Sequence, residues 1–223
     1  MKVAIGIPCM DTVSASFFAS LLKQKYADGR DVRYIVETGS VVHGARWRIA
    51  QQAIRMGADV LVYYDSDMVL EPETTEMLLG ALEGDMPRRQ PKDFMTGLYF
   101  MRRMPTKPLV LESLDWYMDE NFGAQAFADV YEDWPVGSVF EIAGCGFGCC
   151  AVRMDLVRKM MEWYNCNIFH PLQGLGEDYS FCWRARRIPG VKLWCDSRIR
   201  PGHAGLHVYG EWDYNGDWEE GGI

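Results

Sequence analysis

The sequence predicts an α/β fold in which helices cover both faces of a mostly parallel central sheet. Compact apolar runs recur at residues 3–7, 32–36 and 60–64, and segments with helical periodicity separate them. Strand and helix therefore alternate along the first half of the chain, which is the pattern of a parallel sheet covered by helices. The chain has 223 residues, 48% of them hydrophobic, so it can bury a full core as one domain.

The first element is expected to be a buried strand at residues 3–7, which Pro8 ends. A helix over residues 14–26 follows, because its apolar side chains fall on one helical face and Ser14 can cap its first turn. The next compact apolar run, residues 32–36, is the expected second strand.

The next unit leads into an acidic segment. A second helix is expected over residues 44–56, with apolar side chains on its inner face and Gly57 as its C-terminal stop. The third strand, residues 60–64, is apolar throughout, as a strand buried on both faces should be. Asp65 follows it directly.

The second half has a less regular pattern. Pro72 opens a short helix through residue 82, and residues 94–101 are expected to form a strand. Residues 104–138 carry prolines, aromatic and acidic residues without a clear period, so we expect an irregular insertion over a substrate site. Residues 139–152 are apolar and rich in glycine.

Two helices and one strand complete the expected domain. Asp155 is expected to cap a helix with one apolar face, residues 177–187 a short helix, and residues 191–195 the last strand. We assign residues 1–209 to a single domain and residues 210–223 to a flexible acidic and aromatic tail.

Composition argues against several classes of function. The formal net charge of −8 argues against a nucleic-acid binder and against a polybasic membrane anchor. The seven cysteines form no C-x-x-C pair, which favours reduced, mostly buried thiols in a reducing compartment. The first residues indicate a strand, and no apolar run approaches the ~20 residues of a membrane helix, so we expect a cytoplasmic protein without a transmembrane segment.

Two carboxylates follow the third strand. Asp65 and Asp67 flank Ser66 at the carboxyl end of that strand, where open parallel sheets bind ligands. Acids one residue apart on a rigid element can share a hard divalent cation with phosphate oxygens. The alternative is an ordinary surface turn, but a turn rarely needs two acids against a fully apolar strand.

A second acidic pair opens a later helix. Glu177 and Asp178 follow a glycine-rich turn, and a carboxylate on a rigid element can deprotonate an acceptor hydroxyl. Acids at a helix start are also common for electrostatic reasons alone.

Other polar residues could complete a site. His203 and His207 lie in a segment whose proline and glycines disfavour a helix, and either histidine could complete a metal shell or simply be exposed. Arg46 and Arg48 open the second helix, where they could reach a diphosphate or face solvent.

The glycine-rich segment has neither the dinucleotide-binding nor the P-loop pattern, because no helix and no Gly-Lys-Ser/Thr follows it. Its glycines, including Gly144 and Gly146, favour close backbone approach to a ligand.

Taken in order, these segments resemble the GT-A glycosyltransferases, especially the family-2-like group, over nearly the whole chain. The matching segments are Pro8-Cys9-Met10, Gly44-Ala45-Arg46, Asp65-Ser66-Asp67, Gly144-Cys145-Gly146, Gly176-Glu177-Asp178 with Arg184, and His203-Ala204-Gly205. Asp65-Ser66-Asp67 looks like the family's D-x-D motif. Trp47 departs from the pattern, because many members have asparagine there.

The resemblance implies a single-domain GT-A (nucleotide-diphosphosugar transferase) fold and transfer of a sugar to a glycan, lipid-linked or protein acceptor. Residues 1–103 would bind the nucleotide sugar and residues 104–209 the acceptor. The cofactor would be Mn²⁺ or Mg²⁺, which offsets charge on the leaving diphosphate. The implied donor-binding residues are Pro8, Cys9, Met10, Glu37, Arg46, Asp65, Ser66, Gly144 and Gly146.

The resemblance also implies roles for the remaining polar residues. Asp67 and His203 would hold the metal, and Asp65 would join them or hold the ribose. Asp178, beside Glu177, would take the acceptor proton if the reaction inverts at the anomeric carbon, and would bind a hydroxyl if it retains.

Two other functions fit parts of the pattern. A haloacid-dehalogenase-type phosphatase also places D-x-D after a buried strand, with Asp65 as nucleophile and Val69 in the motif. Lys159 and the Glu177-Asp178 pair could fill the later roles of that class. In that class the motif usually comes first in the chain, whereas here two strand–helix units precede it. A non-catalytic nucleotide or sugar binder could use the same fold.

Overall fold

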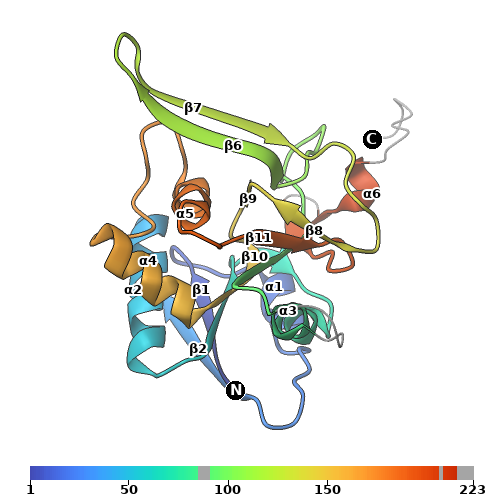
Figure 1. The fold of residues 1–223 in the computed structure, drawn as a ribbon. Helices are drawn as coiled ribbons and strands as arrows, with labels where there is room; N and C mark the ends of the chain where they lie inside the picture. The colour runs from blue at the N-terminus through green and yellow to red at the C-terminus, as the bar shows by residue number, and fades with distance from the viewer. Residues whose placement is uncertain (85–90, 206–207, 215–223) are drawn as a thin grey trace, which may run out of the picture.

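A seven-stranded mixed sheet forms the centre of the molecule, in the order β2-β1-β3-β10-β5-β11-β8 (Figure 1). The computed structural model describes residues 1–84, 91–205 and 208–214. The strands of the central sheet are β1 (Lys2–Pro8), β2 (Asp31–Glu37), β3 (Val60–Tyr64), β5 (Phe94–Gly97), β8 (Val139–Ile142), β10 (Cys149–Arg153) and β11 (Leu193–Asp196).

The central sheet is less parallel than the sequence predicts. β2, β1, β3, β5 and β11 run in one direction, whereas β10 and β8 run antiparallel to their neighbours. β10 enters between β3 and β5 directly after β9 (Gly144–Cys145), without a crossover helix that would return it parallel. Strands from both halves of the chain therefore interleave in one sheet.

Helices cover both faces of the sheet, as predicted. They are α1 (Ala15–Leu21), α2 (Val42–Arg55), α3 (Thr74–Glu83), α4 (Met154–Tyr164) and α5 (Glu177–Arg186), with a short α6 (Glu211–Tyr214) near the end of the described chain. α2, α4 and α5 share one apolar cluster, whereas α1 and α3 share another. Each cluster packs against its own face of the central strands.

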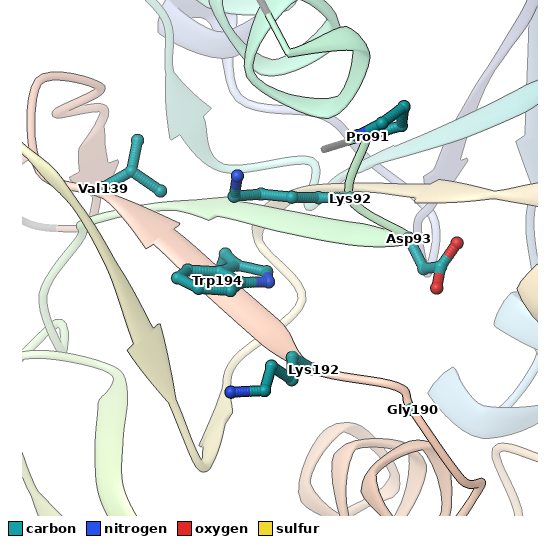
Figure 2. Close-up of a pocket in the computed structure, with 7 residues that line it drawn as sticks. All are labelled: Pro91, Lys92, Asp93, Val139, Gly190, Lys192 and Trp194. Atoms are coloured by element: carbon teal, nitrogen blue, oxygen red, sulfur yellow. The ribbon is translucent and has the colours of Figure 1, made fainter. Parts of the chain in front are cut away.

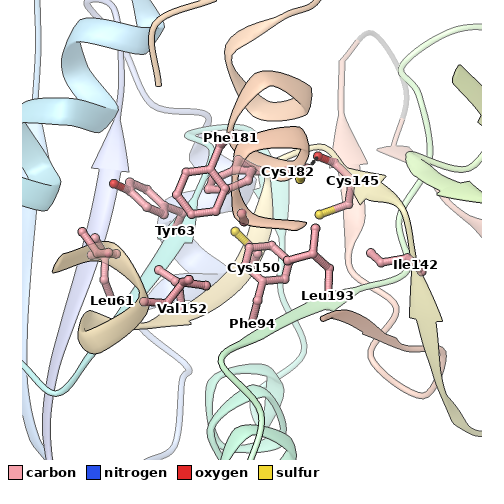
Figure 3. Packing of buried hydrophobic residues seen from close by; sticks show 14 of the residues in the cluster. Leu61, Tyr63, Phe94, Ile142, Cys145, Cys150, Val152, Phe181, Cys182 and Leu193 are labelled. Atoms are coloured by element: carbon pink, nitrogen blue, oxygen red, sulfur yellow. Dashed lines mark hydrogen bonds between the residues drawn. The ribbon is translucent and has the colours of Figure 1, made fainter. Parts of the chain in front are cut away.

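β3 shows why a strand between two helical layers is apolar at every position. Its five residues are all buried. Leu61 and Tyr63 belong to the cluster under α2, α4 and α5, and Val62 and Tyr64 to the opposite cluster. Successive side chains of a strand point to opposite faces, so both sets must be apolar. Figure 3 shows Tyr63 of β3 and Phe181 of α5, which both belong to the first cluster.

Two small sheets extend the central one. β4 (Met68–Val69), β12 (Gly202–Ala204) and β13 (Val208–Tyr209) form the first, in the order β13-β12-β4. β6 (Val110–Asp119), β7 (Gly123–Val130) and β9 form the second, in the order β7-β6-β9. In Figure 1 the long β6–β7 hairpin extends above the central sheet.

The hairpin corrects the prediction of an irregular insertion over residues 104–138. β6 and β7 pair in register over most of their length. Much of this ribbon is exposed on both faces, so its residues need no apolar alternation, and the usual strand signal is missing.

Several predicted boundaries move. The first helix ends at Leu21, the 94–101 strand ends at Gly97, and the last strand of the central sheet is Leu193–Asp196. Asp155 is not a cap: Arg153 is the N-cap of α4, and Asp155 lies in its first turn beside Arg158, 2.9 Å away. The predicted flexible tail begins with α6, and residues 215–223 lie outside the described residues.

Candidate functional site

A cavity of about 340 Å³ lies at the carboxyl ends of β1 and β3. It is lined by Pro8, Cys9, Met10, Ser40, Val42, Ala45, Asp65, Ser66, Asp67, Arg102 and His203. The structure thus brings together the end of the first strand, the predicted D-x-D motif and the predicted histidine. Ligands of open α/β sheets bind at this edge, where loops leave the strands.

Pairing between β4 and β12 places His203 beside Asp67. His203 pairs with Met68 in the antiparallel ladder, and the Ala204 backbone N–H donates a hydrogen bond to the Asp67 carbonyl at 2.7 Å. His203 therefore lies in a buried strand, so the alternative that it is simply exposed does not hold. His207 lies outside the described residues.

The hydrogen bonds of His203 define the role of each ring nitrogen. Nδ1 lies 2.9 Å from the Phe100 carbonyl oxygen, which can only accept, so Nδ1 carries a proton. Nε2 lies 3.4 Å from Asp67 Oδ1. A histidine that binds a metal usually donates its other ring N–H to a carbonyl in this way.

Asp67 Oδ1 is buried and makes no hydrogen bond to any described residue. A protonated His203 would direct its Nε2–H at this oxygen as an ion pair, whereas a neutral His203 with its proton on Nδ1 would leave two acceptors 3.4 Å apart, which a cation between them would satisfy. Burial raises the pKa of Asp67, but His203 and Arg102 outweigh burial, so the net pKa lies below its ordinary value. Asp67 is therefore held as a carboxylate and fits a cation.

Arg102 is a site residue that the sequence reasoning missed. Its Nη1 lies 2.6 Å from Asp67 Oδ2, and its side chain is 49% exposed. The loop after β5 carries it to the mouth of the cavity. The only sequence signal was the Arg102-Arg103 pair in an acidic chain, and nothing local linked that pair to Asp67.

Arg46 does not line the cavity, which corrects its expected contact with a diphosphate. Its guanidinium is buried and donates to Asp65 Oδ1 at 3.0 Å, Glu177 Oε1 at 3.2 Å and the Phe147 carbonyl at 3.2 Å. The Tyr63 hydroxyl in turn donates to the Arg46 carbonyl at 2.7 Å. From within the core, Arg46 thus links the Asp65-Ser66-Asp67 motif to the Glu177-Asp178 pair.

Asp65 is the half-buried acid of the first motif, with 30% of its side chain exposed. Burial raises the pKa of Asp65 above its ordinary value, although Arg46 opposes that change. The Arg46 contact fixes one carboxylate oxygen, and Asp65 still lines the cavity. Asp65 is therefore oriented from behind by an arginine.

Asp178 and Glu177 occupy the first turn of α5, after the N-cap Gly176. Burial and the neighbouring Glu177 raise the pKa of Asp178 to about 6, against the opposing effect of Arg46. Asp178 Oδ1 accepts a hydrogen bond from the Tyr179 backbone N–H at 2.7 Å. Glu177 is held by Arg46, and neither acid lines the 340 Å³ cavity.

The two predicted glycines serve close packing. A Cβ at Gly144 would lie 3.0 Å from Leu114 Cδ2, so that glycine fits the contact between β9 and β6. A Cβ at Gly146 would lie 2.3 Å from the Tyr99 hydroxyl and 3.7 Å from Asp178 Oδ2. Neither glycine lines the cavity, but Gly146 keeps the space beside Asp178 open.

Glu37 is also outside the cavity lining. Its carboxylate accepts from Arg48 Nε at 2.7 Å and from the Gln52 amide, and its carbonyl accepts from the Cys9 N–H at 2.9 Å. Glu37 therefore supports the neighbouring Cys9 backbone, and Arg48 is paired with Glu37.

A protein-only metal cage is absent from the described residues, because no three or more His, Cys, Asp or Glu side chains there are grouped to hold an ion. Asp67 and His203 are at most a partial site. Mg²⁺ typically takes one or two carboxylates together with substrate phosphates and waters. The buried Asp67 oxygen beside His203 fits such a shared site.

Another cavity, of about 440 Å³, lies near the amino ends of β5 and β11, at the other edge of the sheet (Figure 2). Trp194 lies between two lysines there: Lys92 Nζ is 4.7 Å and Lys192 Nζ 5.9 Å from the ring centroid. None of the predicted site residues lines it. Position and converging polar groups favour the smaller cavity as the candidate site.

All seven cysteines are free thiols, and five of them are buried, as predicted. Within the described part of the chain, no helix is both long enough and apolar enough to cross a bilayer.

No protein-family model matches this chain, and a search of curated proteins finds no match. Among solved structures, the crystal structure of A197 from STIV is similar, with a TM-score of 0.62. The alignment covers 92% of this chain and 86% of that one, at 19% sequence identity. A likeness at this identity shows a shared α/β fold, and the chemistry must be argued from the residues of the site.

Proposed function

We propose that this chain is a metal-dependent glycosyltransferase with GT-A organisation, which transfers a sugar from a nucleotide-diphosphosugar to an acceptor hydroxyl. One observation carries the proposal. A single cavity combines the end of β1, the Asp65-Ser66-Asp67 motif after β3, and His203 from a distant strand. The buried Asp67 oxygen without a hydrogen bond supports a cation there.

Asp67 and His203 are the proposed ligands for Mn²⁺ or Mg²⁺. When bound, the ion supplies positive charge that offsets the charge growing on the departing diphosphate. Phe100 orients the His203 ring through the Nδ1 hydrogen bond, which leaves Nε2 directed at Asp67. Asp65, oriented by Arg46, is suited to accept a hydrogen bond from a sugar or ribose hydroxyl.

Asp178 is the proposed general base of an inverting transfer. The acceptor hydroxyl gives its proton to Asp178 while its oxygen bonds to the anomeric carbon and the bond to the diphosphate breaks. The pKa of about 6 leaves Asp178 ionised at neutral pH and makes it a stronger base than an ordinary aspartate. In a retaining transfer, Asp178 would instead bind a hydroxyl.

The phosphatase alternative has less support. Asp65 would have to be a free nucleophile, yet one of its oxygens accepts from the buried Arg46. Lys159 lies on α4 and does not line the cavity. The absence of phosphate release from a simple phosphomonoester would separate the two activities.

Nucleotide binding tests the proposal directly. Thermal shift with each nucleoside diphosphate, with and without Mn²⁺, should give a metal-dependent increase in melting temperature for one base, because a ligand of the native state stabilises it. Asp67→Ala should abolish the metal-dependent part of that binding by calorimetry. Asp155→Ala, at an exposed acid on α4, is the matched control. Unchanged affinity in Asp67→Ala would rule out the proposed metal centre.

The effect of substituting Asp178 distinguishes a glycosyltransferase from a non-catalytic binding protein. In a glycosyltransferase, Asp178→Asn should remove turnover and leave donor affinity unchanged, whereas a binding protein should keep its full function after that change.

A further inference from the structure

A further cavity, called the second cavity from here on, adjoins the candidate site and shares lining residues with it. It is distinct from the cavity around Trp194. Its volume is about 520 Å³, and Arg102 and His203 line both cavities. Its other lining residues are Met101, Arg103, Leu109, Gly205 and Tyr209. No acidic residue is among the described residues that line it, although the formal net charge of the chain is −8.

The side chains of this second cavity favour an anion. Arg102 and Arg103 are both exposed, and guanidinium groups bind phosphate, sulfate and carboxylate through paired N–H donors. Met101 and Leu109 add apolar surface beside them. The cavity therefore suits an acidic group attached to a larger body, with the charge placed at the arginines.

Arg102 connects the two cavities chemically. Its guanidinium is held by Asp67 Oδ2 at 2.6 Å, and 49% of its side chain is exposed to solvent. A divalent ion at Asp67 would compete with Arg102 for that carboxylate, and an anion in the second cavity would compete with Asp67 for Arg102. Binding of either ligand has to break the Arg102–Asp67 ion pair, and once one ligand has broken it the other binds without that cost. The divalent ion and the anion should therefore each raise the affinity of the other.

We propose that the second cavity binds a ligand bearing a phosphate, sulfate or carboxylate group, and that Arg102 couples this ligand to the divalent cation at Asp67. The coupling rests on the metal centre of the proposed function, whereas the anion site does not. For a glycosyltransferase, the inference names the acceptor class: an acceptor that carries negative charge.

Sulfate and Mn²⁺ are the probes, used on the full chain without nucleotide. Calorimetry measures sulfate affinity, and water-proton relaxation measures Mn²⁺ affinity. Saturating sulfate should tighten Mn²⁺ binding about fivefold or more, and Mn²⁺ should tighten sulfate binding by the same factor. Displacement of sulfate by hexyl phosphate or by a sugar phosphate supports the site, and the tighter competitor indicates an apolar or a sugar body. Displacement by neither would overturn the ligand class.

Three variants place the effect. Arg103→Gln should weaken sulfate binding on the order of tenfold, because a charge-assisted contact is lost, and should leave Mn²⁺ affinity in the absence of sulfate unchanged. Arg102→Gln should remove the coupling and raise Mn²⁺ affinity measured without sulfate. Arg158→Gln, at an exposed arginine on α4, should change neither affinity.

The outcomes separate this inference from the proposed function. Sulfate affinity that is the same in Arg103→Gln as in the natural chain would place the anion elsewhere and overturn the inference. Coupling that persists in Arg102→Gln would overturn the role of Arg102. If Mn²⁺ fails to bind under every condition, the proposed metal centre and the coupling are refuted, while a sulfate site weakened by Arg103→Gln still stands.

Discussion

Removal of the buried guanidinium by Arg46→Met should destabilise the protein in a pH-dependent manner. The Arg46 side chain is 3% exposed, and its two carboxylate partners are 30% and 15% exposed. Breaking a buried ion pair by removing one partner typically costs about 3–5 kcal/mol. Because Asp65 and Glu177 retain some contact with water, we expect the lower end, about 3 kcal/mol near neutral pH.

The pH dependence identifies the cause of that loss. Burial raises the pKa of Asp65 and of Asp178, and Arg46 opposes that rise in both. Without Arg46, these two acids should have a still higher pKa in the folded state than in the unfolded state, so the folded state binds more protons. Stability then falls as pH rises through those pKa values. The loss in free energy of unfolding should therefore be larger at about pH 8 than at about pH 5.

Urea denaturation at the two pH values, followed by circular dichroism, measures this difference. Arg48→Met is the matched control, because the Arg48 side chain is 43% exposed and its pair with Glu37 should contribute about 0–1 kcal/mol. A loss below about 1 kcal/mol in Arg46→Met, or a loss equal at both pH values, would refute the buried-charge argument.

Two further predictions concern Asp178 and the neighbouring Gly146. The pH profile of kcat/KM should rise through about pH 6 as Asp178 loses its proton, because only the carboxylate can act as a base. A profile that is flat across that range would exclude Asp178 as the general base. Gly146→Ala should lower the free energy of unfolding by about 1–3 kcal/mol, since its Cβ would lie 2.3 Å from the Tyr99 hydroxyl; a melting temperature equal to that of the natural chain would show that Tyr99 gives way freely.

The sequence by itself determined the parts of the molecule whose environment is local. The apolar run of β3 predicted a strand buried on both faces, and the structure has it at the predicted residues, Val60–Tyr64. Asp65 and Asp67 follow that strand, so their place at its carboxyl end was predictable as well. The start of α5 at Glu177 was likewise visible in its preceding glycines and acids. In each case a few neighbouring residues carry the whole signal.

Tertiary structure alone decided the partners. Periodicity reports which side of an element is buried, but not what lies against it. Arg46 seemed suited to a diphosphate, yet it is buried between two acids. Likewise Arg102 meets Asp67 only because separate loops converge there.

The sequence also did not predict the antiparallel direction of β10 or the pairing of β6 with β7. A buried strand has the same apolar pattern whether it runs parallel or antiparallel to its neighbours, because side chains alternate between the two faces in both cases. The sequence pattern therefore does not give the direction of β10. A ribbon exposed on both faces has no one-sided burial for periodicity to detect. Burial is therefore readable from neighbouring residues, whereas pairing between distant segments depends on the path of the whole chain.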